Sequence, residues 1–443
     1  MADAPSIGAG WFHPSRRPFR FSVLLFVSLL TYGSYFAYDS VGAIPDQLMK
    51  AWGVYQASIG KLYSIYSLAA ILTLFFGGLL VDRIGTRKAS LLFSGLVTAG
   101  AAIVAFAPTV TVAYLGRFLF GWGSESLVVA QSAILSRWFK GKELALSFGV
   151  ALTISRLGTL FTFNTEALIA ERTGYHGALW AAVGFCAVSL LANLVYVAMD
   201  LKGERSLGLE EGSAGDKIVF KDATRFHSSY WYVTLMCVTF YSEIFPYTAL
   251  STDFFHERFG LPMTAGSTGG FLAGVFSSFA HMFSTAPGTS SIIIFASMVF
   301  APFAGGLVDR IGRRASLMVF GSLLMIPCYL LLAFTALPPA IPMVLLGASF
   351  VLVPAAMWPS VPLIVEKQRV GTAFGLMTMV QNIGLMTFPW LNGKLRVMTH
   401  DYAASMMMFA ALGAAGFVFA LLLLGSDRRG GHVLEKPENR SAA

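Results

Sequence analysis

Charge is scarce in this sequence. Only 12% of its 443 residues are Asp, Glu, Lys or Arg, whereas roughly a quarter of the residues in ordinary soluble domains are charged. Because 56% of the residues are hydrophobic, a water-soluble chain of this composition would precipitate. The composition therefore excludes an ordinary soluble protein.

Cysteine and histidine are scarce as well. The three cysteines, Cys186, Cys237 and Cys328, lie in apolar runs without a pairing pattern, which is typical of small buried side chains. All seven histidines lie outside the apolar runs, so we expect neither a metal site nor an intramembrane histidine relay. The sequence also lacks a nucleotide-binding loop and a nucleophile elbow. We therefore expect no enzyme activity and no cofactor.

The sequence is rich in long apolar runs separated by polar segments. A helix needs about 20 mostly apolar residues to cross a bilayer, and twelve runs are predicted to do so. They are Phe21 to Val41, Ile59 to Val81, Ala89 to Phe106, Val112 to Ile134, Leu144 to Ile169, Ala178 to Met199, Trp231 to Leu250, Ser291 to Val308, Leu317 to Phe334, Ile341 to Val365, Thr372 to Leu391 and Ala404 to Leu424.

These runs predict an all-α membrane protein with twelve transmembrane helices in two six-helix halves. Residues 21–199 form the first half and residues 230–425 the second. A polar linker, residues 200–229, joins them, and the tails are residues 1–20 and 426–443.

The distribution of basic residues predicts the orientation. If the N-terminus is cytoplasmic, 23 of the 31 Lys and Arg residues lie on the cytoplasmic side, six on the other side and two, Arg117 and Arg156, within spans. Because cytoplasmic loops carry an excess of Lys and Arg, both termini are predicted to be cytoplasmic. The net charge of +8 then reflects orientation and contact with anionic membrane lipid, and nucleic acid is not expected as a partner.

One short motif, G-x-x-x-D-R-I-G, occurs once in each half, after the second and the eighth runs. The two copies predict a cytoplasmic gate made of Gly78, Asp82, Arg83, Gly85, Gly305, Asp309, Arg310 and Gly312. The first glycine lets helices approach closely, Asp and Arg can pair across a helix end, and the second glycine permits a tight turn. The alternative is a basic loop that only enforces orientation, but two copies in register favour the gate.

With this repeated loop, the whole chain resembles the major facilitator superfamily. The resemblance implies two six-helix units with a substrate site between them near the middle of the membrane. It also implies that the loop takes part in switching between outward-open and inward-open states. Arg117 lies near the outer end of its helix in A-Y-L-G-R-F-L-F-G, and we expect it to be structural or to couple to this switching.

Ionisable residues within membrane spans are costly and usually functional, and we select five of them as candidates. They are Asp39, Arg117, Glu125, Arg156 and Glu243. At 1.5 Å per helical residue, Glu125 lies about 14 Å, and Arg156 and Glu243 each about 18 Å, from the ends of their spans. These three therefore reach the middle of the membrane, whereas Asp39 lies nearer the outer face.

This depth predicts a binding cavity for a zwitterion. Arg156 is expected to face an anionic group, Glu125 a cationic one, and Glu243 to close the cavity from the second half. Arginine suits this role because its planar guanidinium binds a carboxylate with two hydrogen bonds and stays charged. A salt bridge between Glu125 and Arg156 that only stabilises assembly is the alternative.

Several further residues are candidates for substrate contact. Tyr32, Tyr35 and Tyr38 recur every three residues, which favours a packed face, with Tyr35 or Tyr38 reaching the cavity as the second interpretation. Trp358 lies between two prolines in a span predicted to be irregular. Gln381 and Asn382 are polar at membrane depth, where they bind substrate or form hydrogen bonds between helices.

Longer strings resemble the lysosomal dipeptide transporter group of that superfamily. They are Y-D-S-V-G-A-I from Tyr38, G-R-F-L-F-G-W-G-S-E-S-L-V-V-A-Q from Gly116, R-W-F-K-G-K-E-L-A-L-S-F-G from Arg137, S-R-L-G from Ser155, and G-T-A-F-G-L-M-T-M-V-Q-N-I-G-L from Gly371. The resemblance implies that Glu125 and Arg156 engage the charged ends of a dipeptide.

Two features depart from that group. Glu243 has no counterpart in its pattern, and the animal member is regarded as a uniporter, so we hypothesise proton coupling here through Glu243, with Asp39 as a second candidate. The outer segment His256 to Ser290 is longer than expected and contains the apolar stretch Phe271 to Phe283. We expect an interfacial helix there, with a cap over the cavity as the alternative.

The sequence thus predicts a transporter of dipeptides or short peptides that works by alternating access, with small organic anions as the alternative substrates. No acidic dileucine sorting signal occurs near the N-terminus, and the one N-glycosylation sequon begins at Asn439 in the predicted cytoplasmic tail. We therefore expect a bacterial inner membrane protein, a monomer without an accessory subunit.

Overall fold

The computed structural model is helical throughout the part of the chain that it describes. These residues are 13–14, 16–139, 143–207, 225–266, 270–366 and 369–436, and no strand occurs among them. The all-α fold expected from the apolar runs is confirmed.

The first half of the chain contains helices α1 to α6. Their bounds are α1 Arg17–Leu29, α2 Tyr32–Ala43, α3 Pro45–Trp52, α4 Gln56–Phe106, α5 Val110–Phe139 and α6 Leu144–Leu207. The first predicted span covers α1 and α2, which are separated by a break at Leu30 and Thr31. α2 is therefore a helical segment distinct from α1.

Two of these helices each contain two predicted spans joined at a glycine. The backbone of α4 leaves helical geometry at Gly85 (φ 79°, ψ 161°), and that of α6 does so at Gly174 (φ 76°, ψ 169°). Glycine adopts positive φ without the steric cost that a β-carbon brings. The turn predicted at the end of the first D-R-I-G motif is therefore present.

The second half contains helices α7 to α13. Their bounds are α7 Ser228–Phe259, α8 Phe271–Ala280, α9 Ala286–Ile311, α10 Arg314–Phe334, α11 Ala340–Ile364, α12 Val370–Thr399 and α13 Ala403–Arg429. Every predicted span of this half lies in one of these helices, apart from Val365, which follows the end of α11.

Among the described residues, nine helical segments are long and apolar enough to cross a membrane. One of them, Leu146–Ser206, is a 61-residue segment that holds two predicted spans. The chain is thus an integral, multi-pass membrane protein. The count of twelve spans and the cytoplasmic location of the termini remain predictions.

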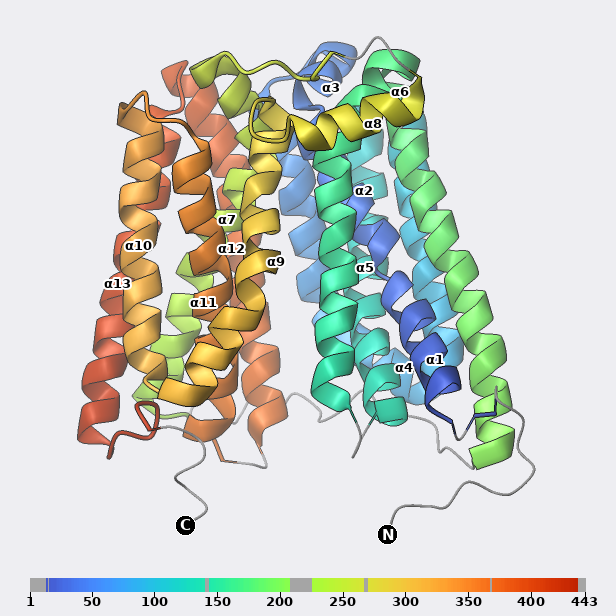
Figure 1. The fold of residues 1–443 in the computed structure, drawn as a ribbon, viewed down its shortest axis with the longest axis vertical. Coiled ribbons are helices and arrows are strands. Elements are labelled where there is room, and N and C mark those ends of the chain that lie inside the picture. The colour runs from blue at the N-terminus through green and yellow to red at the C-terminus, as the bar shows by residue number, and fades with distance from the viewer. Residues whose placement is uncertain are drawn as a thin grey trace.

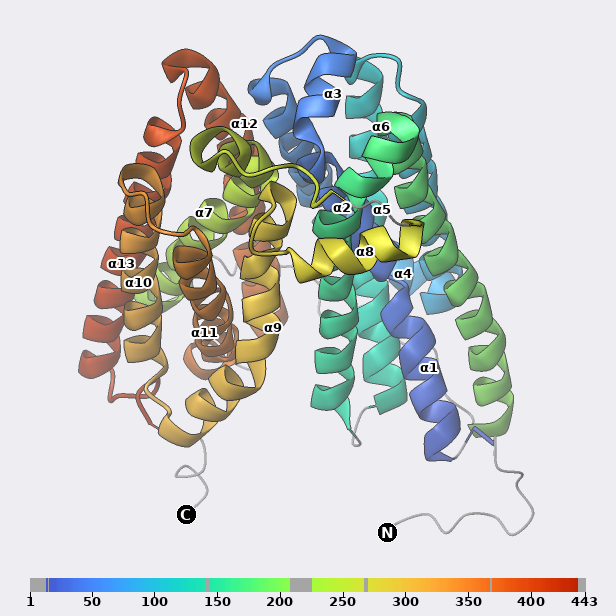
Figure 2. The same ribbon diagram turned by 45° about the horizontal axis from the view of Figure 1, so that its top comes forward.

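The two halves stand side by side, with the start of α1 and the end of α13 at the same end of the molecule (Figure 1). We call that end the termini side. The short helices α3 and α8 lie at the other end (Figures 1 and 2), which we call the α8 side. The helices of each half pack mainly on one another, and the main contacts between halves join α4 to α12 and α6 to α9.

Glycine brings α4 and α12 into backbone contact on the α8 side. A β-carbon at Gly60 would lie 2.0 Å from the carbonyl oxygen of Pro389, and one at Gly393 would lie 2.3 Å from that of Gln56. No larger residue fits either position without a shift of the backbone, so glycine permits the two halves to approach closely there.

Helix α8 confirms the helix expected within the outer segment, and it rests on the other half. Phe279 packs edge-on against Phe161 of α6, with ring centroids 5.1 Å apart. Leu272 and Phe276 remain 72% and 76% exposed. In Figure 2 the helix crosses α6 on the α8 side of the molecule. Contact of its exposed face with lipid remains a prediction.

Candidate functional site

Three predicted side chains, Tyr35 of α2, Glu125 of α5 and Arg156 of α6, lie near one another in the first half. The Tyr35 phenol lies within electrostatic range of Glu125, Arg156 and Asp39. Tyr35, Glu125 and Arg156 are each half-buried, so the protein leaves part of each side chain uncovered. The structure thus brings together the cationic and anionic groups that the depth arithmetic placed at the middle of the membrane.

A tyrosine of α4 positions the anionic group of this layer. The Tyr66 hydroxyl donates a hydrogen bond to Glu125 Oε1 at 2.6 Å and contacts Ser124 Oγ at 3.2 Å. Tyr66 was not among the residues predicted from the sequence, where it is one tyrosine of an apolar run. Hydrogen bonding to a carboxylate orients it and stabilises its charge.

The cationic group of this layer contacts the second half. Arg156 Nη1 donates a hydrogen bond to Ser297 Oγ of α9 at 2.9 Å, and the guanidinium lies 4.9 Å from the centroid of the Phe350 ring of α11. In the described part of the chain, Arg156 and Glu125 form no ion pair with each other. The assembly salt bridge considered from the sequence is therefore not formed, and each charge keeps a neutral partner.

Aromatic residues of the second half lie beside Arg156. Trp358 Nε1 donates to the Tyr241 hydroxyl at 3.0 Å, and its ring centroid lies 5.8 Å from that of Phe374. Tyr241 also interacts electrostatically with Arg156. Trp358 is half-buried and belongs to α11, which continues through its three internal prolines as one helix.

The polar pair of α12 is divided between two environments. Gln381 is half-buried, and its side-chain oxygen accepts a hydrogen bond from the Cys237 thiol at 3.4 Å. Asn382 is buried and donates to the Thr378 carbonyl of its own helix at 3.0 Å. Gln381 is thus joined to α7, as the hydrogen-bonding interpretation expected, whereas the hydrogen bond of Asn382 stays within α12.

Arg117 ties α5 to the end of α2. It is 1% exposed and donates to the carbonyl oxygens of Ala37 and Tyr38, both at 3.2 Å. Its guanidinium also lies 5.1 Å from the centroid of the Tyr38 ring, which packs edge-on against Tyr66. Tyr38 therefore belongs largely to a packed face, while Asp39, one residue on, accepts a hydrogen bond from Thr159 at 2.6 Å.

Glu243 does not join this layer. Its side chain is 1% exposed, and Oε2, which has no hydrogen-bond partner, would lie 2.9 Å from a β-carbon at Gly413 of α13. It also interacts electrostatically with Cys328 and Tyr329 of α10. The carboxylate therefore points into the second half, and the prediction that it closes the cavity opposite Arg156 is wrong for this conformation.

Glu166 was missed by the sequence analysis, although it satisfies the same rule as the five selected residues. It lies within the predicted span Leu144 to Ile169, is 0% exposed, and neither of its carboxylate oxygens has a hydrogen-bond partner. Its position three residues before the end of the run was the available signal.

The predicted gate lies on the termini side, at the turns after Arg83 and Arg310. Both of these arginines are exposed. Gly312 follows α9 with φ 67° and ψ −116°, so the turn predicted at the second motif is also present. A β-carbon at Gly305 would meet nothing within 4 Å, so the close helix approach expected there is absent. The side chains of Asp82 and Asp309, and Gly78, lie outside the described set.

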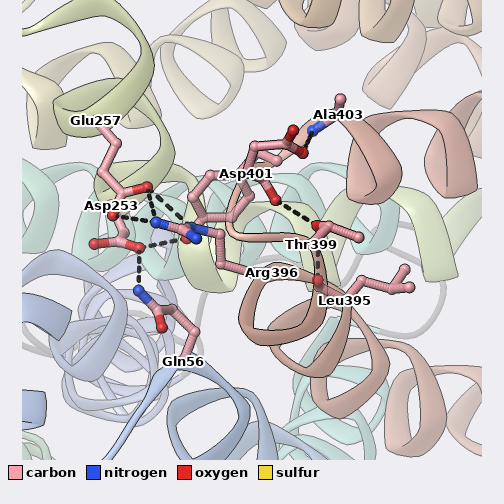
Figure 3. A network of polar contacts seen from close by, with 9 residues as sticks. Gln56, Asp253, Glu257, Leu395, Arg396, Thr399, Asp401 and Ala403 are labelled. Atoms are coloured by element: carbon pink, nitrogen blue, oxygen red, sulfur yellow. Dashed lines mark hydrogen bonds and ion pairs between the residues drawn. The ribbon is translucent and has the colours of Figure 1, made fainter.

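A polar network on the α8 side links the halves (Figure 3). Asp253 of α7 accepts hydrogen bonds from Gln56 Nε2 of α4, at 3.1 Å, and from the Tyr402 hydroxyl. Arg396 of α12 donates to both oxygens of Glu257, at 2.8 and 2.7 Å. Together with the glycine contacts of α4 and α12, this network holds the halves together on that side.

Comparison with known proteins identifies related sequences over most of the chain. The profile of the Major Facilitator Superfamily matches residues 24–290 and 281–442. The lysosomal dipeptide transporter MFSD1 of Danio rerio is 34% identical over 387 residues, 84% of this chain and 79% of that protein. The protein of the same name from Homo sapiens is 32% identical over 434 residues, 95% of this chain and 89% of that protein.

Solved structures share the fold. A mutant of the peptide transporter POT in complex with sulfate matches with a TM-score of 0.70 at 14% identity, over 97% of each chain. The nucleoside transporter NupG matches with a TM-score of 0.65 at 16% identity, over 91% of this chain and 98% of that one. These relatives and structures are transporters, not enzymes.

Proposed function

This chain belongs to the major facilitator superfamily, and we propose that it carries dipeptides or other short zwitterionic peptides across the membrane by alternating access. The observation that supports this most directly is the layer around Tyr35, where Glu125 and Arg156 carry opposite charges without pairing with each other. The similarity to relatives that are named lysosomal dipeptide transporters also supports this proposal.

In the proposed complex, Arg156 binds the peptide carboxylate and Glu125, held by Tyr66, binds the amino group. The guanidinium fork provides two parallel hydrogen bonds to a carboxylate, and the Glu125 carboxylate provides an ionic acceptor for an ammonium group. Because Arg156 also contacts Ser297 of α9, a substrate that competes for this guanidinium alters a contact between the halves. Tyr35, Trp358 and Gln381 complete the proposed site.

The paired loops on the termini side are proposed as the gate that alternates with the α8 side.

We also propose that protons move with the peptide, with Glu243 or Asp39 as the proton carriers. A Glu243→Gln variant that retains full pH-driven accumulation contradicts proton coupling through Glu243. We propose a bacterial inner membrane and a monomer without an accessory subunit, although the relatives are named as lysosomal proteins.

Uptake of a radiolabelled neutral dipeptide into proteoliposomes tests the proposal. We expect unlabelled neutral dipeptides to compete and small monocarboxylates to compete poorly, because the latter lack the amino group that Glu125 binds. Arg156→Ala should abolish uptake, whereas Arg205→Ala, at an exposed position of the same helix, should not. Equal competition by monocarboxylates would identify an organic anion carrier instead.

A further inference from the structure

Glu166 of α6 is an ionisable residue that the proposed substrate site does not use. Its side chain is 0% exposed, and neither carboxylate oxygen has a hydrogen-bond partner. No ion pair reaches it among the residues that the structure describes. An isolated carboxylate ion in a low-dielectric interior is strongly disfavoured, and such a group instead takes up a proton and becomes neutral.

Helical periodicity places Glu166 on the face of α6 that meets α2. Thr162, four residues earlier, donates a hydrogen bond to the Phe36 carbonyl of α2 at 3.0 Å. Thr159, seven residues earlier, donates to Asp39 of α2 at 2.6 Å. Residues at these spacings share one helix face. Glu166 therefore continues a stripe of hydroxyl and carboxyl groups along the interface of α2 and α6.

The charged groups on the neighbouring elements are engaged elsewhere or lie at a distance along the helices. On α2 the only carboxylic acid is Asp39, which is bonded to Thr159. On α5, Arg117 is held by carbonyl oxygens of α2 and Glu125 by Tyr66. Helix α8 has no charged residue, and α9 has none between Ala286 and Val308. On α1 and α4, Arg20 pairs with Glu143 and Arg87 with Asp200.

We infer that Glu166 is a proton-binding site: it is the neutral acid in this conformation and releases its proton when the interface of α2 and α6 admits water. In that step the O–H bond breaks, the proton passes to water, and the electron pair remains on the carboxylate. No oxidation or reduction takes place. The inference rests on the proposed function for its role in transport, because it names the ion that would move with the peptide.

Helix α2 connects this proton site to the substrate layer. The same short helix carries Tyr35, beside Glu125 and Arg156, and Asp39, one turn further on. Glu166 lies ten residues after Arg156 on α6, roughly 15 Å along the helix. The break at Leu30 and Thr31 separates α2 from α1. Because Glu166 lies on the face of α6 that meets α2, a substrate that displaces α2 also changes the surroundings of Glu166.

The test compares the wild-type protein with Glu166→Gln and with Glu171→Gln, a control at an exposed position five residues along the same helix. Each is reconstituted in liposomes with an internal pH dye. Alanyl-alanine counterflow, which needs no proton gradient, is measured beside the pH change that accompanies alanyl-alanine uptake. The infrared absorption of protonated carboxylic acids is recorded at neutral pH without substrate.

We expect Glu166→Gln to keep counterflow, to lose the pH change, and to lack one protonated-acid band that the wild type and Glu171→Gln both show. A pH change retained in Glu166→Gln, or an infrared spectrum that this substitution leaves unchanged, overturns the inference. Loss of counterflow or failure to fold also overturns it, because glutamine has the shape of the neutral acid and replaces it without strain.

The same experiment separates this inference from the proposed function. If the wild type exchanges alanyl-alanine without any pH change, the peptide transporter stands and the proton site falls. If the wild type does not exchange alanyl-alanine at all, the proposed function fails, and the infrared band alone decides whether Glu166 holds a proton.

Discussion

The hydroxyl of Tyr66 is the group that fixes Glu125, because it is the donor bonded to that carboxylate at 2.6 Å. A hydrogen bond to a charged group contributes about 1.5–3 kcal/mol, and each 1.4 kcal/mol corresponds to about a factor of ten in affinity. We therefore expect Tyr66→Phe to raise the KM for a neutral dipeptide about tenfold or more.

The matched control for Tyr66→Phe is Tyr114→Phe. Tyr114 donates to the Ser58 carbonyl at 3.4 Å, away from the charged layer, and its substitution should leave the KM unchanged. Initial rates of labelled dipeptide uptake measure both variants. Equal KM values for Tyr66→Phe and the wild type would show that Glu125 does not depend on this donor.

Counting residues along a helix predicted how deep a side chain lies in the membrane, but not the helix face on which it lies. Glu125, Arg156 and Glu243 were all placed at mid-membrane, and the first two do share a layer around Tyr35. Glu243 follows Tyr241 by two positions, a rotation of about 200° around the helix axis. Tyr241 therefore faces Arg156 while Glu243 faces α10 and α13. Only the packing of neighbouring helices decides which face is which.

Helices α4 and α12 form the closest contact between the halves, and glycine makes it possible. The β-carbon introduced by Gly60→Ala would lie 2.0 Å from the Pro389 carbonyl oxygen, so the two helices must separate on the α8 side. We expect this variant to favour the conformation that is open on that side. Spin labels placed across the α8 side should report a longer distance between the halves.

The control for this substitution is Gly95→Ala, also in α4, where a β-carbon would meet nothing within 4 Å. Its distance distribution should match that of the wild type. If Gly60→Ala leaves the distance unchanged as well, the α4 and α12 contact does not determine closure on the α8 side.

The elements were well predicted by the apolar runs because burial in lipid requires every backbone polar group to be bonded within the segment, which only a helix achieves along a single run. The positions at which the helices break were less predictable. The break at Leu30 and Thr31 divides a continuous apolar run, so nothing in its composition marks it. Gly85 was predicted as a turn because its motif is repeated, whereas Gly174 has no second copy.

In the whole molecule, the two halves contribute different side chains to the proposed site. The first half supplies both charges and the buried acid Glu166, while the second supplies aromatic rings and the Ser297 hydroxyl beside Arg156. The glycine contacts of α4 with α12 and the Asp253 network join the halves on the α8 side. The structure is therefore closed on that side, which agrees with one of the two end states of the alternating access proposed for this protein.

The central claim is that Glu125 and Arg156 bind opposite ends of one zwitterionic peptide. Calorimetric titration of alanyl-alanine, its N-acetyl derivative and its C-terminal amide into the wild type, Glu125→Gln and Arg156→Gln tests it most directly. We predict that N-acetylation weakens binding to the wild type but does not weaken binding to Glu125→Gln any further. C-terminal amidation should likewise weaken binding to the wild type but not to Arg156→Gln. Each pair of changes should give a coupling energy of about 1.5–3 kcal/mol. Blocking groups that weaken the variants as much as the wild type would contradict the account.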